Sequence, residues 1–418
     1  LEFRRVLFRS LLPRFILERV KVQLEMFLDP APEANLLVVT LEQRTTAIAN
    51  LSTAERDAAL ARARDVVRSR IRPAYQRVLA FVREHLPRAD TAAGWNRLPR
   101  GDAAYAHQLH YYTTTSLRAD EIHALGLREV ARLEAEAEPL LRELGATKGT
   151  LAERMARATT GALVTGTPDP RAAILARYTE LIRDAEKRSS GLFNLRPRAP
   201  VEVRRVPPLT ERVSSAYYSV PPADRSRPGI FWVPLPGEVF HFRAGMRTLA
   251  YHEAVPGHHF QLALQAEQKD LPRFRARRTF GGISAHSEGW GLYAERLAVE
   301  QGWYEGDPFG RLGALASELF RARRLVVDTG LHTRGWSRQQ AINYGISASE
   351  VERYLVNPGQ ACSYMIGLLR ILELREQARV ALGPRFSLPD FHDVVLKTGS
   401  VPLDVLADVV REWVASRR

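Results

Sequence analysis

The chain has 418 residues, of which 45% are hydrophobic and 26% are charged, which excludes a disordered or collagen-like protein. The net charge of +13 comes from 55 arginines and five lysines that form no dense basic block, so no nucleic-acid partner is expected. No stretch reaches the roughly 20 apolar residues of a membrane span. The single cysteine, Cys362, excludes a thiolate cluster, so His, Asp or Glu must hold any metal.

The first ten residues, LEFRRVLFRS, resemble translated adapter or cloning sequence and are set apart from the fold. We expect the natural chain to be longer at its amino end, with helices there that cover an apolar groove. The compartment, cytoplasm or an exported location, and the oligomeric state are left open.

Residues 11–188 have the pattern of a helical scaffold. A capping box is predicted at Ser52 and Glu55, and a second helix start at Asp169 and Pro170. After Arg118 a long helix is predicted, with a kink at Pro139 and a stop at Gly145. Its apolar face is formed by Ile122, Leu125, Val130 and Leu133.

Residues 189–242 change to a texture rich in Pro, Ser and Gly, with strands expected at 201–206, 216–220 and 229–233. Residues 243–418 return to helical periodicity and are expected to form the part that carries the functional site. Helix starts are predicted at Ser349 with Glu352, at Ser387 and at Pro402. The expected fold is mainly α, with a small β insert around 200–235, packed as one body.

Histidines concentrate in the third quarter of the chain. Five of the eleven fall within 46 residues: His241, His252, His258, His259 and His286. The centre of this cluster is the segment YHEAVPGHHF. Zinc peptidases of the HExxH type place two His one turn apart on a helix, with a Glu after the first that activates water. Glu253 follows His252 in the same way.

The spacing of this motif is unusual, because on a regular helix His258 would lie about 9 Å along the axis from His252. Ligands of one zinc ion lie only a few Å apart. We therefore predict that Pro256 and Gly257 break the helix and bring His258 or His259 back beside His252. Alternatively, Pro-Gly ends the helix and the histidines lie on a surface turn.

Glu288, in the segment GGISAHSEGW, is the candidate for a third ligand, as in gluzincins, which take a Glu from a following helix. A surface or salt-bridge role is the alternative for Glu288. His286 and Glu295 are expected to orient ligands, and His259 either to bind the metal or to pack beside it. Asp328 is a further candidate for binding the metal or orienting a ligand.

Four motifs together are highly specific: HEAVPGHHFQ, SEGWGLYAE, VDTGLHTRGWS and PGQACSYMIG. With the earlier TTTSLRADEIHALGLREV, they resemble the bacterial domain-of-unknown-function 885 family (DUF885), regarded as zinc metallopeptidases. The resemblance covers nearly all of the chain after residue 10. It implies a mostly helical zincin fold with a long cleft, similar in style to neurolysin and angiotensin-converting enzyme.

Two later segments could complete the cleft. Arg324, Asp328 and His332 recur every four residues, so an Asp–His hydrogen bond is feasible, although a plain surface helix fits equally well. Similar helical zinc peptidases stabilise the oxyanion with a Tyr and a His, which makes His332 and Tyr364 candidates for this role. Core packing is the alternative for Tyr364. The candidates for substrate binding are Gln360, Arg324 and Tyr218.

The function expected from these residues is a zinc-dependent hydrolase that cleaves peptide or related amide bonds, with Glu253 as general base. One alternative is a helical binding or scaffold protein whose metal is structural or lost. Another is a metal-dependent hydrolase of a non-peptide bond. A serine hydrolase is disfavoured, because the chain has no G-x-S-x-G motif.

Overall fold

The computed structural model describes residues 11–160, 169–212, 214–237, 243–279 and 281–417. The ten residues expected to derive from cloning, and His241, therefore lie outside the described residues. The chain divides into two compact units, Leu1–Pro99 and Arg100–Arg418. No domain boundary is predicted at this point of the sequence, because no flexible linker marks it.

The first unit is helical throughout its described part. Its elements are α2 (Arg14–Leu28), η1 (Pro32–Ala34), α3 (Leu36–Thr46), α4 (Thr53–Val66), the π-helix η2 (Val67–Ile71), α5 (Arg72–His85), η3 (Leu86–Arg88) and η4 (Trp95–Arg97). The predicted capping box of Ser52 and Glu55 is confirmed. Two small apolar clusters hold the unit, while Met26 and Phe81 are 68% and 55% exposed.

The second unit contains the large core. Its first helices are α6 (Gly101–Thr113), α7 (Ala119–Glu143), α8 (Leu151–Thr160) and α9 (Arg171–Arg188). After the sheet come α11 (Arg243–Glu253), α12 (His258–Glu267), α13 (Arg273–Ala276), α14 (Ser284–Glu300), α15 (Pro308–Thr333), α16 (Arg338–Asn343) and α17 (Ala348–Val356). The last elements are η5 (Gln360–Cys362), α18 (Ser363–Leu382), η6 (Gly383–Arg385), α19 (Leu388–Thr398) and α20 (Leu403–Arg417).

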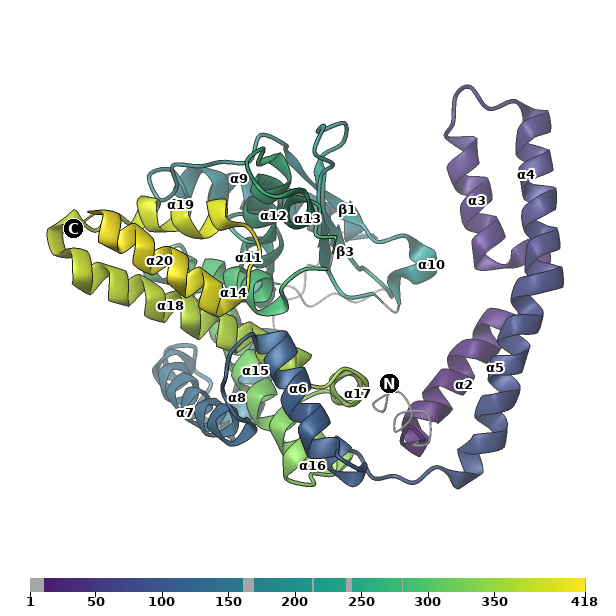
Figure 1. Ribbon diagram of the computed structural model, residues 1–418, viewed down its shortest axis with the longest axis horizontal. Coiled ribbons are helices and arrows are strands. Elements are labelled where there is room, and N and C mark those ends of the chain that lie inside the picture. The colour runs from purple at the N-terminus through teal and green to yellow at the C-terminus, as the bar shows by residue number, and fades with distance from the viewer. Residues whose placement is uncertain (1–10, 161–168, 213, 238–242, 280, 418) are drawn as a thin grey trace. The chain divides into compact units, whose positions relative to one another are not determined.

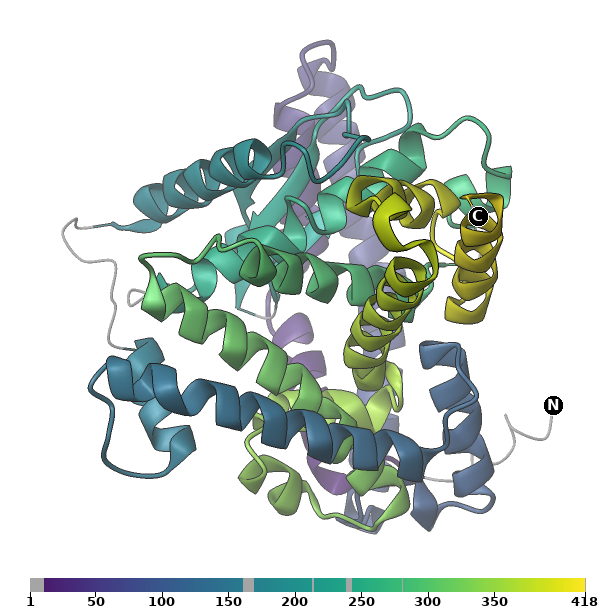
Figure 2. The same ribbon diagram turned by 90° about the vertical axis from the view of Figure 1, so that its left-hand side faces the viewer.

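The long helices α7 and α15 pack along each other (Figure 2). The predicted apolar face of α7 is confirmed, since Ile122 and Leu133 are fully buried. Gly126 lies against α15, where a Cβ atom would approach the Leu325 Cβ to 2.7 Å. Helix α7 continues through Pro139 and ends just before Gly145, which has a φ of +72°. This glycine is the predicted stop.

The predicted β insert is a three-stranded sheet of β1 (Val201–Arg205), β3 (Gly229–Val233) and β2 (Tyr217–Ser219), in that order. Strand β1 is parallel to β3, and β2 is antiparallel to it, with Tyr218 opposite Phe231. The short helix α10 (Pro208–Glu211) lies between β1 and β2 in the chain. The strands of this insert are confirmed to within one residue at each end.

Helices α14, α18 and α20 lie close together in the carboxyl-terminal part, where α18 contacts both of the others (Figure 1). Two glycines allow the close approach of α14 to α18: a Cβ on Gly289 would lie 2.5 Å from the Gly367 backbone. Ser387 caps α19 and α20 begins directly after Pro402, as predicted. The predicted cap at Ser349 is wrong, because Ser347 caps α17 and accepts from the amide of Glu350.

Helices make up 69% of the structure, so the fold is mainly α with a small β insert, as expected. None of the described helices combines the length and the apolar character that crossing a membrane requires.

Candidate metal centre

The segment from His252 to His258 joins two helices through a sharp turn. Helix α11 ends at Glu253 and α12 begins at His258, so the predicted interruption is confirmed. A Cβ on Gly257 would lie 1.9 Å from the backbone oxygen of His252, which leaves room for glycine alone. This close return of the backbone brings the rings of His252 and His258 to a centroid distance of 4.7 Å.

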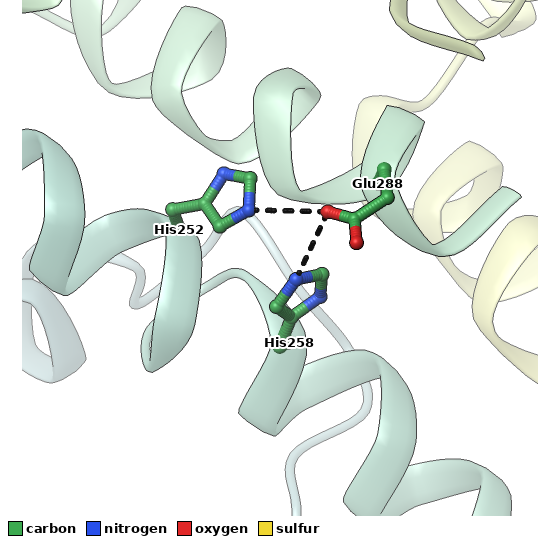
Figure 3. Close-up of side chains that lie close together, drawn as sticks. All are labelled: His252, His258 and Glu288. Carbon is green, nitrogen blue, oxygen red and sulfur yellow. Dashed lines mark ion pairs between the residues drawn. The ribbon is translucent and has the colours of Figure 1, made fainter. Parts of the chain in front are cut away.

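Glu288, in the second turn of α14, points at both histidines (Figure 3). Its Oε2 lies 3.4 Å from Nε2 of His252 and 3.4 Å from Nε2 of His258. One ligand atom from each of the three residues lies within 4.8 Å of the other two. The structure therefore brings together two imidazoles and one carboxylate from segments 30 residues apart.

This geometry fits a tetrahedral metal site. Ligand atoms about 2.1 Å from a zinc ion lie about 3.4 Å from one another in a tetrahedron. The distances from Glu288 to the two histidines agree with that spacing. Among the described residues the group has three members, which leaves one of four positions for water or substrate, as in catalytic zinc sites.

Two residues on α14 fix the orientation of the His252 ring. His252 Nδ1 donates to Glu295 Oε1 over 2.7 Å, so that Nε2 is directed toward Glu288. Glu295 is held in turn by the Ser317 hydroxyl, which donates to its Oε2. Gly291 makes space for the ring, because a Cβ there would lie 2.6 Å from His252 Cε1.

His252 and Glu288 influence each other's ionisation. Burial opposes charge on His252, but hydrogen bonds with Glu288 and Glu295 raise its pKa to about 10. Burial also opposes ionisation of Glu288, yet its contacts with His252 and His258 hold the pKa well below the usual range. The carboxylate of Glu288 is therefore ionised and concentrates negative charge where a cation would be bound.

Comparison with known families and structures identifies the chain. The family model described as "Bacterial protein of unknown function (DUF885)" matches residues 8–410. The chain belongs to this family. A search of the curated proteins finds no match.

Two solved structures are similar to this DUF885 chain. The "putative lipoprotein from Colwellia psychrerythraea" is 36% identical with a TM-score of 0.91, over 97% of this chain and 71% of that one. A "putative lipoprotein of unknown function from Shewanella oneidensis" is 19% identical, with a TM-score of 0.66 over 89% of this chain and 69% of that one. The second likeness concerns the fold alone.

Glu253, the predicted base, is the last residue of α11 and is 7% exposed. Burial and the charge of Glu253 together raise the pKa of the Tyr178 hydroxyl on α9. That hydroxyl is buried and has no hydrogen-bond partner among the described residues. No role was predicted for Tyr178 from the sequence. A tyrosine in an apolar helical pattern gives no sign that it lies near Glu253, which is 75 residues away.

His259 and His286 lie outside the three-residue group. The Tyr218 hydroxyl donates to Nδ1 of His259 over 2.8 Å, so this histidine joins α12 to the β insert. Nδ1 of His286 lies 3.1 Å from the backbone oxygen of Val401. Burial lowers the pKa of each ring to about 4, so both are neutral.

The residues predicted on α15 are buried in a separate set of contacts. Asp328 accepts hydrogen bonds from the Tyr105 hydroxyl and from the Gly359 amide rather than from His332. The His332 ring stacks on Tyr105, and its Nε2 donates to the backbone oxygen of Tyr354. These contacts are those of a packed side chain and do not join His332 to the three ligand atoms.

Tyr364 and Gln360 each interact with a residue of α14, the helix that carries Glu288. The negative charge of Glu288 contributes, after burial, to raising the pKa of Tyr364. The Arg324 guanidinium stacks on the Tyr364 ring, 4.4 Å from its centroid. Gln360 accepts from Arg353 and donates to the hydroxyl of Ser284, one turn before Glu288 on α14.

Proposed function

We propose that this protein is a zinc-dependent hydrolase, and more specifically a metallopeptidase that cleaves peptide bonds. The observation that carries the proposal is the group of His252, His258 and Glu288 beside the buried Glu253. Three protein ligands with one open position are typical of catalytic zinc sites, whereas structural sites close all four positions.

The ligand types support zinc, because two imidazoles and a carboxylate are a ligand set that zinc accepts in hydrolases. When bound, a zinc ion supplies a Lewis acid that polarises a carbonyl and lowers the pKa of water. The protein contributes the orientation of its ligands, through Glu295 on His252 and through the turn at Gly257.

Glu253 is proposed as the general base. Its carboxylate takes one proton from the attacking water and passes it to the leaving nitrogen, while the carbon–oxygen bond forms and the carbon–nitrogen bond breaks. One water is consumed, and a carboxylate and an amine are released. The buried Tyr178 hydroxyl, which has no hydrogen-bond partner among the described residues and lies within the field of Glu253, is proposed to orient this carboxylate.

Tyr364 is proposed to donate to the oxyanion that develops on the scissile carbonyl. The Arg324 guanidinium stacks on its ring, and the negative charge of Glu288 contributes to raising the pKa of its hydroxyl. His332 is not included in this step, because its Nε2 is occupied by the backbone of Tyr354.

The alternative of a binding protein with a structural metal predicts a fourth protein ligand. Within the described part of the chain the ligand group has three members, which favours hydrolysis. A non-peptide amide would use the same water, base and oxyanion donor, and a substrate screen separates these bonds.

The test compares Glu253→Gln with wild type. The amide keeps the shape of the side chain but cannot accept a proton, so zinc binding should be retained while turnover of a peptide library falls by at least about 100-fold. Glu412→Gln, on an exposed position of α20, is the matched control and should retain full activity. Full activity in Glu253→Gln, or no zinc binding by wild type, would overturn the proposal.

A further inference from the structure

One arginine outside the candidate ligand group, Arg278, lies close to the start of α14 and interacts electrostatically with Glu288. Arg278 lies in the connection between α13 and α14, and its guanidinium rests against Gly282, where a Cβ would lie 1.9 Å from its NH2 atom. Gly282 is two residues before α14 begins, and Glu288 follows in the second turn. The arginine is therefore held beside the start of the helix that carries the third ligand.

The guanidinium of Arg278 makes no salt bridge within the part of the chain that the structure describes. Among the described residues no carboxylate lies within salt-bridge distance of it, and its buried Nε has no hydrogen-bond partner. Burial lowers the pKa of this guanidinium, and the charge of Glu288 partly restores it. A half-buried cation without a partner is costly, and an incoming anion would remove that cost.

Two further arginines, Arg324 and Arg353, act on Tyr364, whose pKa the charge of Glu288 also raises. Arg324 and Arg353 share a single carboxylate, that of Glu350. Arg324 is 6% exposed, and its NH1 atom is buried without a partner among the described residues. Its guanidinium lies between the rings of Phe320 and Tyr364, each 4.4 Å away.

These groups are linked to α14 by hydrogen bonds. Arg353 donates to Gln360, and Gln360 donates to Ser284, which is four residues before Glu288 and so on the same face of the helix. Arg324 and Arg353 are thus connected, through Gln360 and Ser284, to the helix that carries Glu288, and they share one carboxylate, Glu350.

We propose that Arg278 binds the terminal carboxylate of a peptide substrate, so that the enzyme acts as a carboxypeptidase. A guanidinium matches a carboxylate with two parallel hydrogen bonds. Every linear peptide carries one carboxylate at its carboxyl end, and capture of this group beside the ligands would place a nearby peptide bond at Glu288. The inference rests on the proposed hydrolase function.

The first test needs no variant at Arg278. Zinc-loaded Glu253→Gln protein is titrated with three forms of one peptide: the free acid, the carboxyl-terminal amide, and the amide with an internal glutamate. The free acid should bind about 10-fold to 100-fold more tightly than either amide, because hydrogen bonds to charged groups are worth that factor. Equal binding of acid and amide would overturn the proposal, and so would rescue of the amide by the internal glutamate.

The second test substitutes Arg278→Gln in the same background and in active protein. The preference for the free acid should disappear in binding and in kcat/KM, and Arg278→Lys should retain part of it. Arg277→Gln, at the exposed neighbouring position, is the matched control and should retain the preference. Circular dichroism verifies folding of each variant.

The outcomes separate the two proposals. If wild type with zinc cleaves acid and amide at equal rates, the carboxypeptidase inference fails and the hydrolase proposal stands. If wild type with zinc cleaves no peptide while Glu253→Gln still prefers the free acid, the hydrolase proposal fails and Arg278 remains a carboxylate-binding residue.

Discussion

Gly291 offers a direct test of the metal centre that does not alter any ligand. In Gly291→Ala the new Cβ would lie 2.6 Å from Cε1 of His252 and 2.9 Å from both ring nitrogens. Carbon contacts are normally about 3.5 to 4.0 Å, so the ring must retreat by about 1 Å. Its Nδ1 is held by Glu295, which limits the directions in which the ring can move.

The displacement is large for a metal ligand, because the distance between a metal ion and its ligand atom tolerates a change of only about 0.2 Å. Loss of a group that orients a ligand typically costs 10-fold to 100-fold in metal affinity, or about 1.4 to 2.7 kcal/mol. Alanine also favours a helix over glycine by roughly 1 kcal/mol, and this gain offsets part of the cost of moving the His252 ring. The stability of the metal-free protein should therefore change little, while the stabilisation by zinc falls.

The assay measures the zinc Kd by competition with a chelating dye, and the unfolding midpoint with and without zinc. Gly245→Ala is the matched control, because this glycine lies on α11 with His252 and a Cβ there meets no atom within 4 Å. The control should bind zinc like wild type. A zinc Kd for Gly291→Ala within about twofold of wild type would refute the reasoning, since each tenfold change corresponds to 1.4 kcal/mol.

Two further predictions concern residues outside the ligand set. Tyr364→Phe should lower kcat about 100-fold to 1000-fold with little change in KM, because an oxyanion donor acts mainly in the transition state. Tyr111→Phe, at an exposed position, is the control and should leave kcat unchanged. An unchanged kcat in Tyr364→Phe would exclude Tyr364 as the oxyanion donor. Burial raises the pKa of Asp328 to about 7, against hydrogen bonds from Tyr105 and Gly359 that lower it. Since this folded-state pKa exceeds the unfolded value near 3.8, the stabilisation is full below pH 4 and is lost as pH rises to about 7, on the order of a few kcal/mol. Urea unfolding of chelator-treated protein should show this loss in wild type and not in Asp328→Asn; parallel pH profiles would contradict it.

The approach of His252, His258 and Glu288 could be predicted in part, because local sequence determines much of it. Pro256 and Gly257 interrupt the helix by themselves, and Glu288 lies on the next long helix. The choice between His258 and His259 could not be made, because it depends on tertiary contacts. Tyr218 comes from a strand about 40 residues earlier and engages His259, which leaves His258 beside His252.

The incorrect cap at Ser349 has a similar origin. Ser347 and Ser349 each precede a glutamate by three residues, so both satisfy the capping pattern. In the structure Glu352 accepts from Arg338, and Ser347 caps the helix. Local patterns locate a helix start to within a few residues, and long-range partners decide between equivalent candidates.

The small residues of α14 show what sequence pattern leaves undetermined. The segment SEGWG is too rich in glycine for an ordinary core helix, which indicates a special role without saying which. In the structure its two glycines serve different purposes, since Gly289 allows α18 to approach and Gly291 makes room for the His252 ring. A Cβ at Gly289 would meet backbone, which cannot rotate away, so it should disturb the packing of the two helices before it affects the metal. The same segment thus carries Glu288 itself and, at Gly291, provides the space that the His252 ring occupies.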